Sequence, residues 1–279
     1  MKHAFIVILT LAACFGIQAL ALRAVGGRTT KSESNYFSSL GRIQAGSTGK
    51  PGIMLLGSSI TGRLPDRANG FEGVANMGCD GGSAVDALRA MDRGLLPAAP
   101  VLVVEVNTLH RALDPIPSEV GQAMDSPWFQ AGVRVPGVSA YARPAGFFYS
   151  ALLARKIGGF GDPVTGPDLG VSSRPGRPEL AVDEDEIHGE RALADEIVQY
   201  IRNLGSRGSR VVLVWLPPGR GAGSPTPSWI AKIVRDSGAE WWDLGTEADP
   251  AVVELTDGVH MSAHSAARTV ITLKKGLQR

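Results

Sequence analysis

The sequence has few of the residues that define disulfide-stapled or nucleic-acid-binding proteins. Only two of its 279 residues are cysteines, Cys14 and Cys79, which is too few for a disulfide framework or a cysteine metal site. Its 28 basic and 27 acidic residues leave a formal net charge of +1, without a dense cluster of Lys and Arg. These absences disfavour a nucleic-acid partner and predict a fold that packing alone stabilises.

Several motifs of other enzyme classes are also missing. The sequence has no Gly-x-x-x-x-Gly-Lys-Ser/Thr phosphate loop and no His-Glu-x-x-His zinc motif. The lack of a Gly-x-Ser-x-Gly elbow counts against the α/β-hydrolase fold. The glycine-rich residues 219–223 have the wrong spacing for a dinucleotide loop, and two prolines precede them. We therefore expect neither a cofactor nor a metal ion.

Residues 1–25 are predicted to be an export segment. A mostly apolar run over residues 4–22 follows a basic start, and Arg23 closes it. The run has about the 20 residues that are needed to span a bilayer. Three outcomes stay open: cleavage after Ala21, retention as a membrane anchor, or lipidation at Cys14. All three place the protein outside the cytoplasm, in the periplasm, at the membrane or secreted.

Residues 26–50 are predicted to be a linker, because they are rich in Gly, Ser and Thr and show little periodicity, with room for a short helix near residues 36–44. The folded domain is expected over residues 51–279. Within it, residues 110–185 interrupt the pattern with Pro, Gly and scattered aromatics. Such a stretch is typical of an insertion that shapes a site or of a partly disordered segment.

The rest of the domain alternates short apolar runs with amphipathic segments, which indicates an α/β fold. The apolar runs are continuous, as in strands that are covered on both faces, so we expect a central parallel sheet between helices. The expected strands cover residues 53–56, 101–106, 211–216 and 240–244. The expected helices cover residues 84–93, 190–203, 228–237 and 262–277.

A serine with a possible chemical role follows the first expected strand. Residues 53–56 lead directly into Gly57, Ser58 and Ser59. Ligands of parallel sheets bind at the carboxyl ends of the strands, so the Ser59 hydroxyl is expected to face a pocket. A simple turn or helix cap is the alternative for this segment taken alone. A nucleophile would need partners elsewhere in the chain.

Such partners lie near the other end of the chain. Asp257 and His260 stand three positions apart on a loop before the last expected helix. A serine becomes nucleophilic when one imidazole nitrogen faces its hydroxyl and a carboxylate holds the other. A surface loop would explain this spacing on its own. Together with a strand-end serine, it predicts a catalytic triad.

Two further segments supply hydrogen-bond donors. Gly78 offers a backbone amide that no side chain blocks, and Asn107 follows the second expected strand with a side-chain amide. Such donors stabilise the oxyanion of a tetrahedral intermediate, each lowering the barrier by about 3 kcal/mol. A turn at Gly78 and a cap at Asn107 are the plainer alternatives.

In chain order these segments resemble the four sequence blocks of the SGNH (GDSL-like) hydrolases, a class of esterases, lipases and carbohydrate deacetylases. The resemblance implies a three-layer α/β/α flavodoxin-like fold with a central parallel sheet. It also implies that Ser59 is the nucleophile, His260 its base and Asp257 the residue that orients the base. The implied oxyanion hole consists of the Ser59 and Gly78 backbone amides and the Asn107 side chain. The matching segments are Gly57-Ser58-Ser59, Asn76-x-Gly78-x-x-Gly81, Asn107 and Asp257-x-x-His260.

The sequence departs from the family pattern at three positions. Ser58 stands where the first block usually has Asp, and Glu105 and Thr108 replace the outer residues of the usual Gly-x-Asn-Asp. The residues that act directly are unchanged. These departures indicate a divergent branch whose substrate cannot be transferred by analogy.

Taken together, the patterns predict an exported serine esterase that forms an acyl-enzyme on Ser59. The expected partner is an acylated carbohydrate, cell-envelope material or another ester that carries acetyl or short acyl groups. Two alternatives stay open: an O-acyltransferase that uses a sugar hydroxyl as acceptor, and a non-catalytic envelope protein that retains the fold for binding. Membrane anchoring through residues 4–22 is compatible with each.

Overall fold

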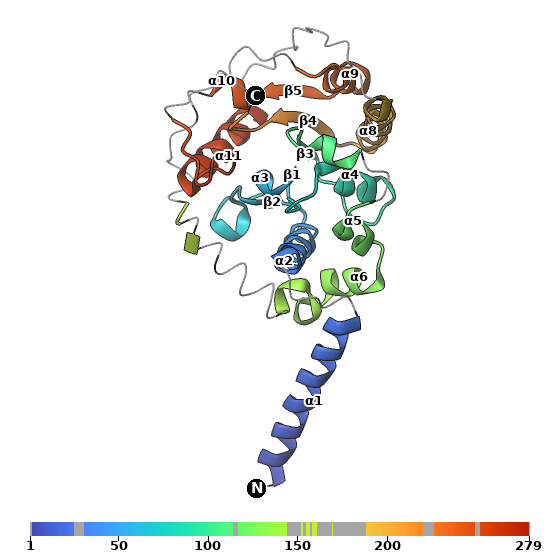
Figure 1. Cartoon of the computed structure of the whole chain (residues 1–279), viewed down its shortest axis with the longest axis vertical. Helices are drawn as coiled ribbons and strands as arrows, with labels where there is room; N and C mark the ends of the chain where they lie inside the picture. The colour runs from blue at the N-terminus through green and yellow to red at the C-terminus, as the bar shows by residue number, and fades with distance from the viewer. Residues whose placement is uncertain are drawn as a thin grey trace.

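The computed structural model of the chain shows an α/β fold with a five-stranded, all-parallel sheet (Figure 1). It describes residues 2–24, 31–113, 117–143, 152, 155–156, 158–160, 169, 188–219, 226–248 and 252–278. The strands are β1 (Ile53–Leu56), β2 (Val74–Asn76), β3 (Val101–Glu105), β4 (Arg210–Trp215) and β5 (Glu240–Asp243). The α-helices are α1 (Lys2–Ala24), α2 (Lys31–Gly46), α3 (Ser59–Gly62), α4 (Ala84–Asp92), α5 (Glu119–Met124), α6 (Pro127–Arg134), α8 (His188–Ser206), α9 (Ser228–Ser237), α10 (Leu244–Glu247) and α11 (Ala263–Leu277). Short 3-10 turns are η1 (Arg67–Asn69), η2 (Leu109–Ala112), η3 (Pro136–Val138) and η4 (Ala140–Ala142).

The strands lie in the order β2-β1-β3-β4-β5. In register, Ile53 of β1 pairs with Val74 on one side and with Val101 on the other. The predicted parallel sheet is confirmed, and the four predicted strands begin and end within one residue of those observed. The short edge strand β2 was not predicted, because its three residues form no extended apolar run.

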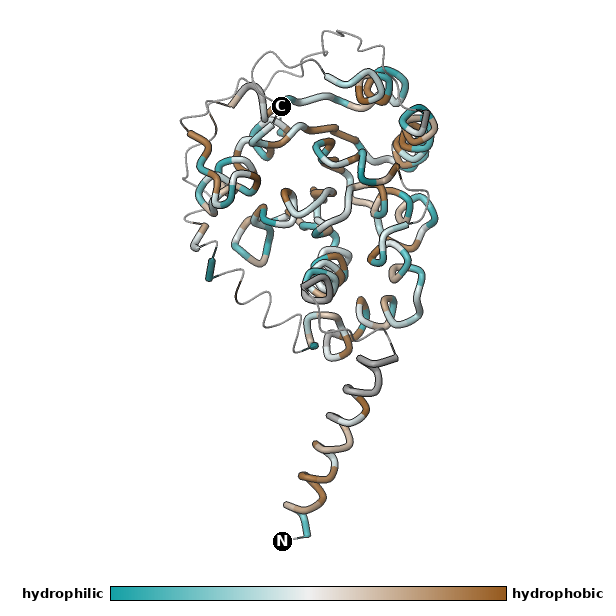
Figure 2. Tube along the Cα trace, viewed as in Figure 1, coloured by the Kyte–Doolittle hydropathy of each residue, from teal (hydrophilic) through white to brown (hydrophobic). Residues whose placement is uncertain are grey.

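Two hydrophobic clusters cover the two faces of the sheet. Along β3, Leu102 and Val104 pack into one cluster with α2, α4, α8 and α9, whereas Val103 packs into the other with α3 and α11. The strand β4 alternates in the same way, and its apolar colouring is visible in Figure 2. Burial on both faces explains why the strand sequences are continuously apolar, and removal of this surface from water stabilises the fold.

Helix α2 belongs to the folded domain, so the predicted linker over residues 26–50 is wrong where this helix lies. Phe37, Leu40 and Ile43 are buried in the same cluster as the sheet. Their spacing is that of one apolar face of a helix, although glycines and serines around them conceal the pattern. The domain therefore begins before residue 51, and the short helix predicted near residues 36–44 is part of its core.

The first part of the predicted insertion at residues 110–185 is helical and packs on α2. The Gln44 side chain of α2 joins α6 to η4: its Nε2 donates to the Phe129 carbonyl at 3.0 Å, and its Oε1 accepts from the Ala140 amide at 2.8 Å. Most of the remainder, from residue 144 to 187, lies outside the described residues. The described part of the insertion thus extends the side of the domain on which α2 lies.

Helix α1 projects from the rest of the chain, with the N-terminus at its far end (Figure 1). Phe5, Ile8 and Leu11 are among its exposed apolar side chains. Within the described ranges, no helix combines the length and the apolar character that crossing a bilayer requires. Export and the fate of the leader stay predictions.

Candidate active site

Ser59 begins α3 at the carboxyl edge of the sheet, shortly after β1 ends at Leu56. Ser58 caps the helix, because its Oγ accepts the Ile60 amide hydrogen at 3.1 Å. Ser58, Ile60 and Thr61 are buried, while Ser59 is only half-buried. The turn therefore presents the Ser59 side chain toward the surface, where ligands of parallel sheets bind.

The loop with Asp257 and His260 is closed as a small hairpin. An antiparallel bridge joins Leu255 to Met261, and the Thr256 amide donates to the His260 carbonyl at 2.8 Å. At its tip, Asp257 Oδ1 accepts the backbone N–H of Val259 at 3.2 Å and that of His260 at 2.9 Å. A carboxylate that caps its own turn is held beside the imidazole three residues later, which accounts for the Asp-x-x-His spacing.

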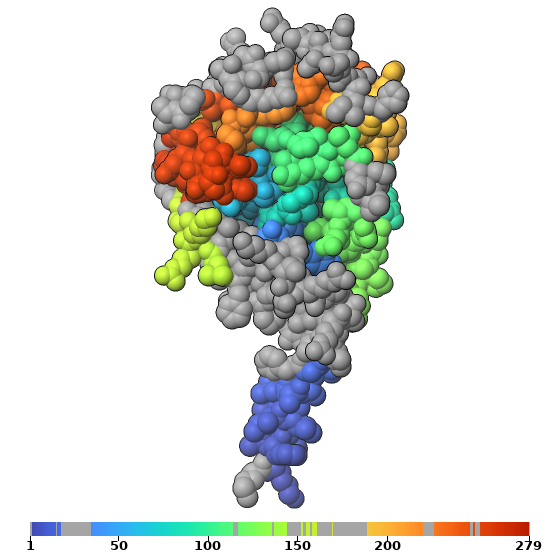
Figure 3. Space-filling model, viewed as in Figure 1, coloured from blue at the N-terminus to red at the C-terminus, as the bar shows by residue number. Residues whose placement is uncertain are grey.

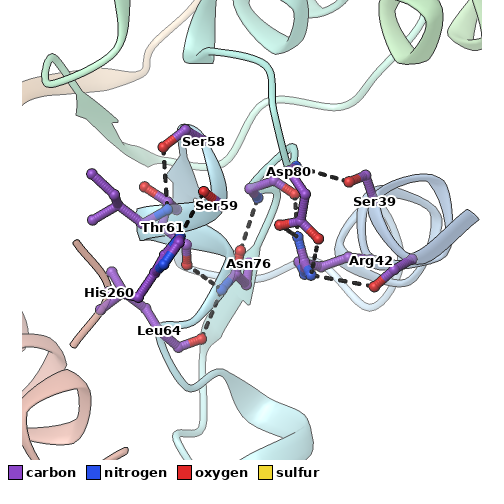
Figure 4. A network of polar contacts seen from close by, with 12 residues as sticks. Ser39, Arg42, Ser58, Ser59, Thr61, Leu64, Asn76, Asp80 and His260 are labelled. Carbon is purple, nitrogen blue, oxygen red and sulfur yellow. Dashed lines mark hydrogen bonds and ion pairs between the residues drawn. The ribbon is translucent and has the colours of Figure 1, made fainter. Parts of the chain in front are cut away.

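The structure brings the three predicted triad residues into one hydrogen-bonded chain. His260 Nε2 lies 2.9 Å from Ser59 Oγ (Figure 4), although the two residues are 201 positions apart in sequence. His260 Nδ1 lies 2.9 Å from Asp257 Oδ2 and 3.0 Å from Oδ1. These contacts fit a neutral ring that donates from Nδ1 to the carboxylate and accepts the serine proton at Nε2.

The groups around the Asp257 carboxylate favour its ionised form. Burial acts to raise the pKa of Asp257, but hydrogen bonds from the backbone and ring of His260 and from the Val259 amide lower the pKa well below its usual range. Arg63 adds an ion pair to the same carboxylate from the end of α3. An ionised Asp257 holds the imidazole in the orientation that general-base chemistry needs.

The segments that form the site meet on one face of the molecule. Figure 3 shows red atoms of the C-terminal region beside blue atoms of the segment after β1. Green atoms from the region after β3 border the blue atoms on the other side. The three sequence regions that carry the triad and Asn107 are therefore neighbours in space.

Gly78 lies next to the turn that carries Ser59, but its amide has a different partner from the one predicted. Its N–H donates to Asn76 Oδ1 at 2.8 Å, and Asn76 Nδ2 donates to the Thr61 and Leu64 carbonyls, both at 2.7 Å (Figure 4). A Cβ on Gly78 would lie 2.6 Å from Gly62 Cα, so no larger residue fits. The prediction that Gly78 donates to the oxyanion is corrected: close packing against α3 requires the glycine, and the amide is used within its own loop.

Asn107 links the ends of two neighbouring strands. Its Nδ2 donates to the Leu216 carbonyl at 2.8 Å, and its Oδ1 accepts the Leu216 amide at 2.9 Å. One hydrogen of Nδ2 is left over, and none of the described residues accepts it. Of the predicted oxyanion donors, Asn107 is thus held rigidly with one hydrogen still available.

The Ser59 amide is the second available donor. Along the first turn of α3, the Ile60 N–H donates to Ser58 Oγ, that of Thr61 to Glu105 Oε2, and that of Gly62 to the Ser58 carbonyl. The first amide of a helix has no partner inside the helix. No described side chain or carbonyl accepts the N–H of Ser59, so this amide remains for a ligand.

Glu105 is the residue that sequence reasoning left without a role. It is fully buried at the end of β3, and its carboxylate accepts hydrogen bonds from Ser58, Thr61 and Thr108. The signal in the sequence was an acidic residue at the end of an apolar strand, at a position where the family pattern has glycine.

Other chemistry has little support in the described part of the chain. No group of three His, Cys, Asp or Glu side chains there comes together as metal ligands do. Burial raises the pKa of the Cys79 thiol to about 12, so this thiol is a poor candidate nucleophile.

Comparisons of the chain with protein-family models, curated proteins and solved structures found no match. Membership of the SGNH class therefore stays a prediction from the sequence blocks.

Proposed function

We propose that this protein is a serine esterase that forms an acyl-enzyme on Ser59. The observation that carries the proposal is the continuous hydrogen-bonded chain from Asp257 through His260 to Ser59 Oγ. A binding protein would have no use for this order of contacts, whereas activation of a serine by a general base requires it.

In the proposed reaction, Ser59 Oγ attacks the ester carbonyl carbon while His260 Nε2 takes its proton. The Ser59 N–H and the remaining Nδ2 hydrogen of Asn107 are the proposed donors to the tetrahedral oxyanion. As the intermediate collapses, the imidazolium gives its proton to the leaving alcohol. A water molecule, deprotonated by the same ring, then attacks the acyl-enzyme, and the imidazolium returns that proton to Ser59 Oγ as the carboxylic acid leaves. Asp257 stays ionised throughout and stabilises the imidazolium.

The proposed fold is the three-layer flavodoxin-like architecture of the SGNH class. The strand order β2-β1-β3-β4-β5 and helices on both faces of the sheet support it. In doubly wound sheets of this order, ligands bind beside β1 and β3, where the order of strands reverses. Ser59 and Asn107 follow those two strands.

The proposed substrates are acetyl or other short acyl esters of carbohydrate or cell-envelope material. This part of the proposal rests on the resemblance to carbohydrate deacetylases and on the predicted export segment. Transfer to a sugar hydroxyl would use the same acyl-enzyme and differ only in the acceptor.

The proposal is tested by mass spectrometry of the protein after reaction with a fluorophosphonate. We expect one adduct on Ser59 that is absent from Ser59→Ala and from His260→Ala. Ser47→Ala serves as the matched control, since its hydroxyl bonds only to its own helix at the Ile43 carbonyl. A folded native protein that forms no adduct would overturn the proposal. With an activated acetyl ester, free acetate identifies an esterase, and an acetylated sugar acceptor identifies a transferase.

A further inference from the structure

Glu105 has an unusual environment for an acidic residue. Its side chain is completely buried, and within the described residues it forms no ion pair. Five donors satisfy its carboxylate. Oε2 accepts the Ser58 amide at 2.9 Å, the Thr61 amide at 3.2 Å and the Thr61 hydroxyl at 2.7 Å. Oε1 accepts the Ser58 hydroxyl at 2.8 Å and the Thr108 hydroxyl at 2.9 Å.

The chain leaves room for this carboxylate at Gly57. A Cβ at that position would collide with Glu105 Oε2 and with Thr61 Oγ1, and would lie 2.7 Å from Glu105 Cβ. The glycine of the first sequence block is therefore required by the close approach of Glu105. Burial of an acidic group is costly unless hydrogen bonds replace its lost water, and here the turn itself supplies those hydrogen bonds.

The donors to Glu105 flank the proposed nucleophile. Ser58 precedes Ser59 and Thr61 follows it by two positions, so the carboxylate fixes the backbone on both sides of that residue. With those amides fixed, the free N–H and the hydroxyl of Ser59 have defined directions. Thr108 connects the same carboxylate to the segment that carries Asn107.

We infer that Glu105 is a positioning residue for the acyl transfer on Ser59, holding the nucleophile turn and the Asn107 segment in one arrangement. The inference rests on the proposed function. It also accounts for the three departures from the SGNH pattern together, because Ser58 and Thr108 both donate to the Glu105 carboxylate. The acidic group that the first block usually carries at position 58 is supplied here from the end of β3, and it reaches Ser58 directly.

The test compares Glu105→Gln with Val104→Ala. Glutamine keeps the shape of the side chain but turns an NH2 group toward donors that need an acceptor. Val104 lies next to Glu105 on the same strand and is equally buried, but its side chain points to the opposite face and packs into the cluster with α2 and α4, so it reports a loss of stability alone. Three experiments are made: steady-state kinetics with an activated acetyl ester for kcat and KM, the rate of fluorophosphonate labelling, and hydrogen exchange at the Ser58 and Thr61 amides.

We expect Glu105→Gln to lower kcat by about 100-fold while KM changes little, because a displaced nucleophile slows chemistry without removing substrate contacts. Exchange at the two amides should rise roughly tenfold more than in Val104→Ala, because glutamine keeps only one of the two acceptor oxygens that five donors share. Thr61→Val, which removes one donor and leaves the carboxylate, should shift the same quantities in the same direction by less. This second variant keeps the test informative should Glu105→Gln fail to fold.

Equal kcat in Glu105→Gln and the native protein, or an equal loss in Val104→Ala, would overturn the inference. A native protein that is neither labelled nor active would instead overturn the proposed function. In that case, unchanged exchange at the Ser58 and Thr61 amides of Glu105→Gln would also rule out the positioning role. Faster exchange would show that Glu105 still holds the turn around Ser59.

Discussion

Arg63 Nη2 lies 3.4 Å from Asp257 Oδ2, so one side chain joins the helix of the proposed nucleophile to the loop of its acid. Its Nη1 also donates to Thr256 Oγ1 at 2.9 Å. Arg63 caps the C-terminus of α3, four residues after Ser59. The contact therefore links the end of the helix that carries Ser59 to the loop that carries Asp257.

We expect Arg63→Ala to slow labelling of Ser59 about two- to fivefold, since the Asp257 side chain is one-third exposed and such pairs contribute about 0.2–1 kcal/mol. The difference from the native protein should shrink as salt is added. Arg93→Ala removes a more exposed pair with Asp125 and should leave the labelling rate unchanged. A similar loss in both variants would indicate a general charge effect.

Asp257→Asn should lower kcat by about 10³- to 10⁴-fold, as the same change does in other serine triads. The amide cannot hold the His260 ring in the tautomer that leaves Nε2 free to accept a proton. Steady-state kinetics with an activated acetyl ester measures the loss. Asp125→Asn, an exposed carboxylate in the ion pair with Arg93, is the matched control. A loss of less than tenfold would mean that His260 is oriented by other contacts.

Stability should depend on Asp257 in a defined pH range. Its pKa is lowered in the folded protein, so the ionised form stabilises the fold at every pH above the ordinary aspartate pKa of about 3.9. That contribution declines as the pH falls from there through the lowered pKa. The difference in Tm between the native protein and Asp257→Asn should be constant near neutral pH and shrink below about pH 4. Thermal unfolding from pH 7 to the acid range checks this, and a difference that persists unchanged in acid would contradict it.

Gly78→Ala should destabilise the protein and displace α3. The new Cβ would lie 2.6 Å from Gly62 Cα and 2.8 Å from the Ser58 carbonyl oxygen, and backbone atoms cannot yield as a flexible side chain can. We expect a loss of about 1–3 kcal/mol in the free energy of unfolding, together with slower labelling of Ser59. Gly205→Ala, on α8 with open space around it, should be neutral or slightly stabilising.

Removal of α2 should prevent folding. A chain over residues 51–279 lacks Phe37, Leu40 and Ile43 and would expose the core face that they cover. It would also leave Asp80 without Arg42, with which it forms a buried ion pair at 3.2 Å. A chain over residues 26–279 should unfold cooperatively, whereas the shorter chain should not. Equal melting temperatures for the two chains would show that α2 is dispensable.

The sheet was largely predictable because its central strands are continuous apolar runs. β1 and α9 have the predicted limits, since each is bounded by residues that end the pattern. The burial of α2 was missed because three apolar residues among many small polar ones give little signal until a core covers them. Helix α2 is buried because segments far away in the sequence form the surface against which it packs.

The site was predictable to a smaller extent. Asp257 and His260 stand out by local spacing, but the partners of Gly78 and Asn107 depend on where neighbouring strands end. The Asn76 side chain accepts the Gly78 N–H, and the Leu216 carbonyl accepts a hydrogen bond from the Asn107 side chain. Glu105 required the structure, because most of its donors, those on Ser58 and Thr61, lie 47 and 44 positions away in the chain.

The hydrogen bond between Ser58 and Glu105 couples the residues at two of the positions where the chain differs from the SGNH pattern. Aspartate at position 58 beside Glu105 would place two buried acids in contact, and glycine at 105 beside Ser58 would leave the turn without an acceptor. We expect either substitution alone to be unfavourable, and therefore predict that the two positions change together. Relatives of this chain should carry serine and glutamate as a pair, and a sequence pattern that couples the two blocks should find them where patterns that score each position separately do not.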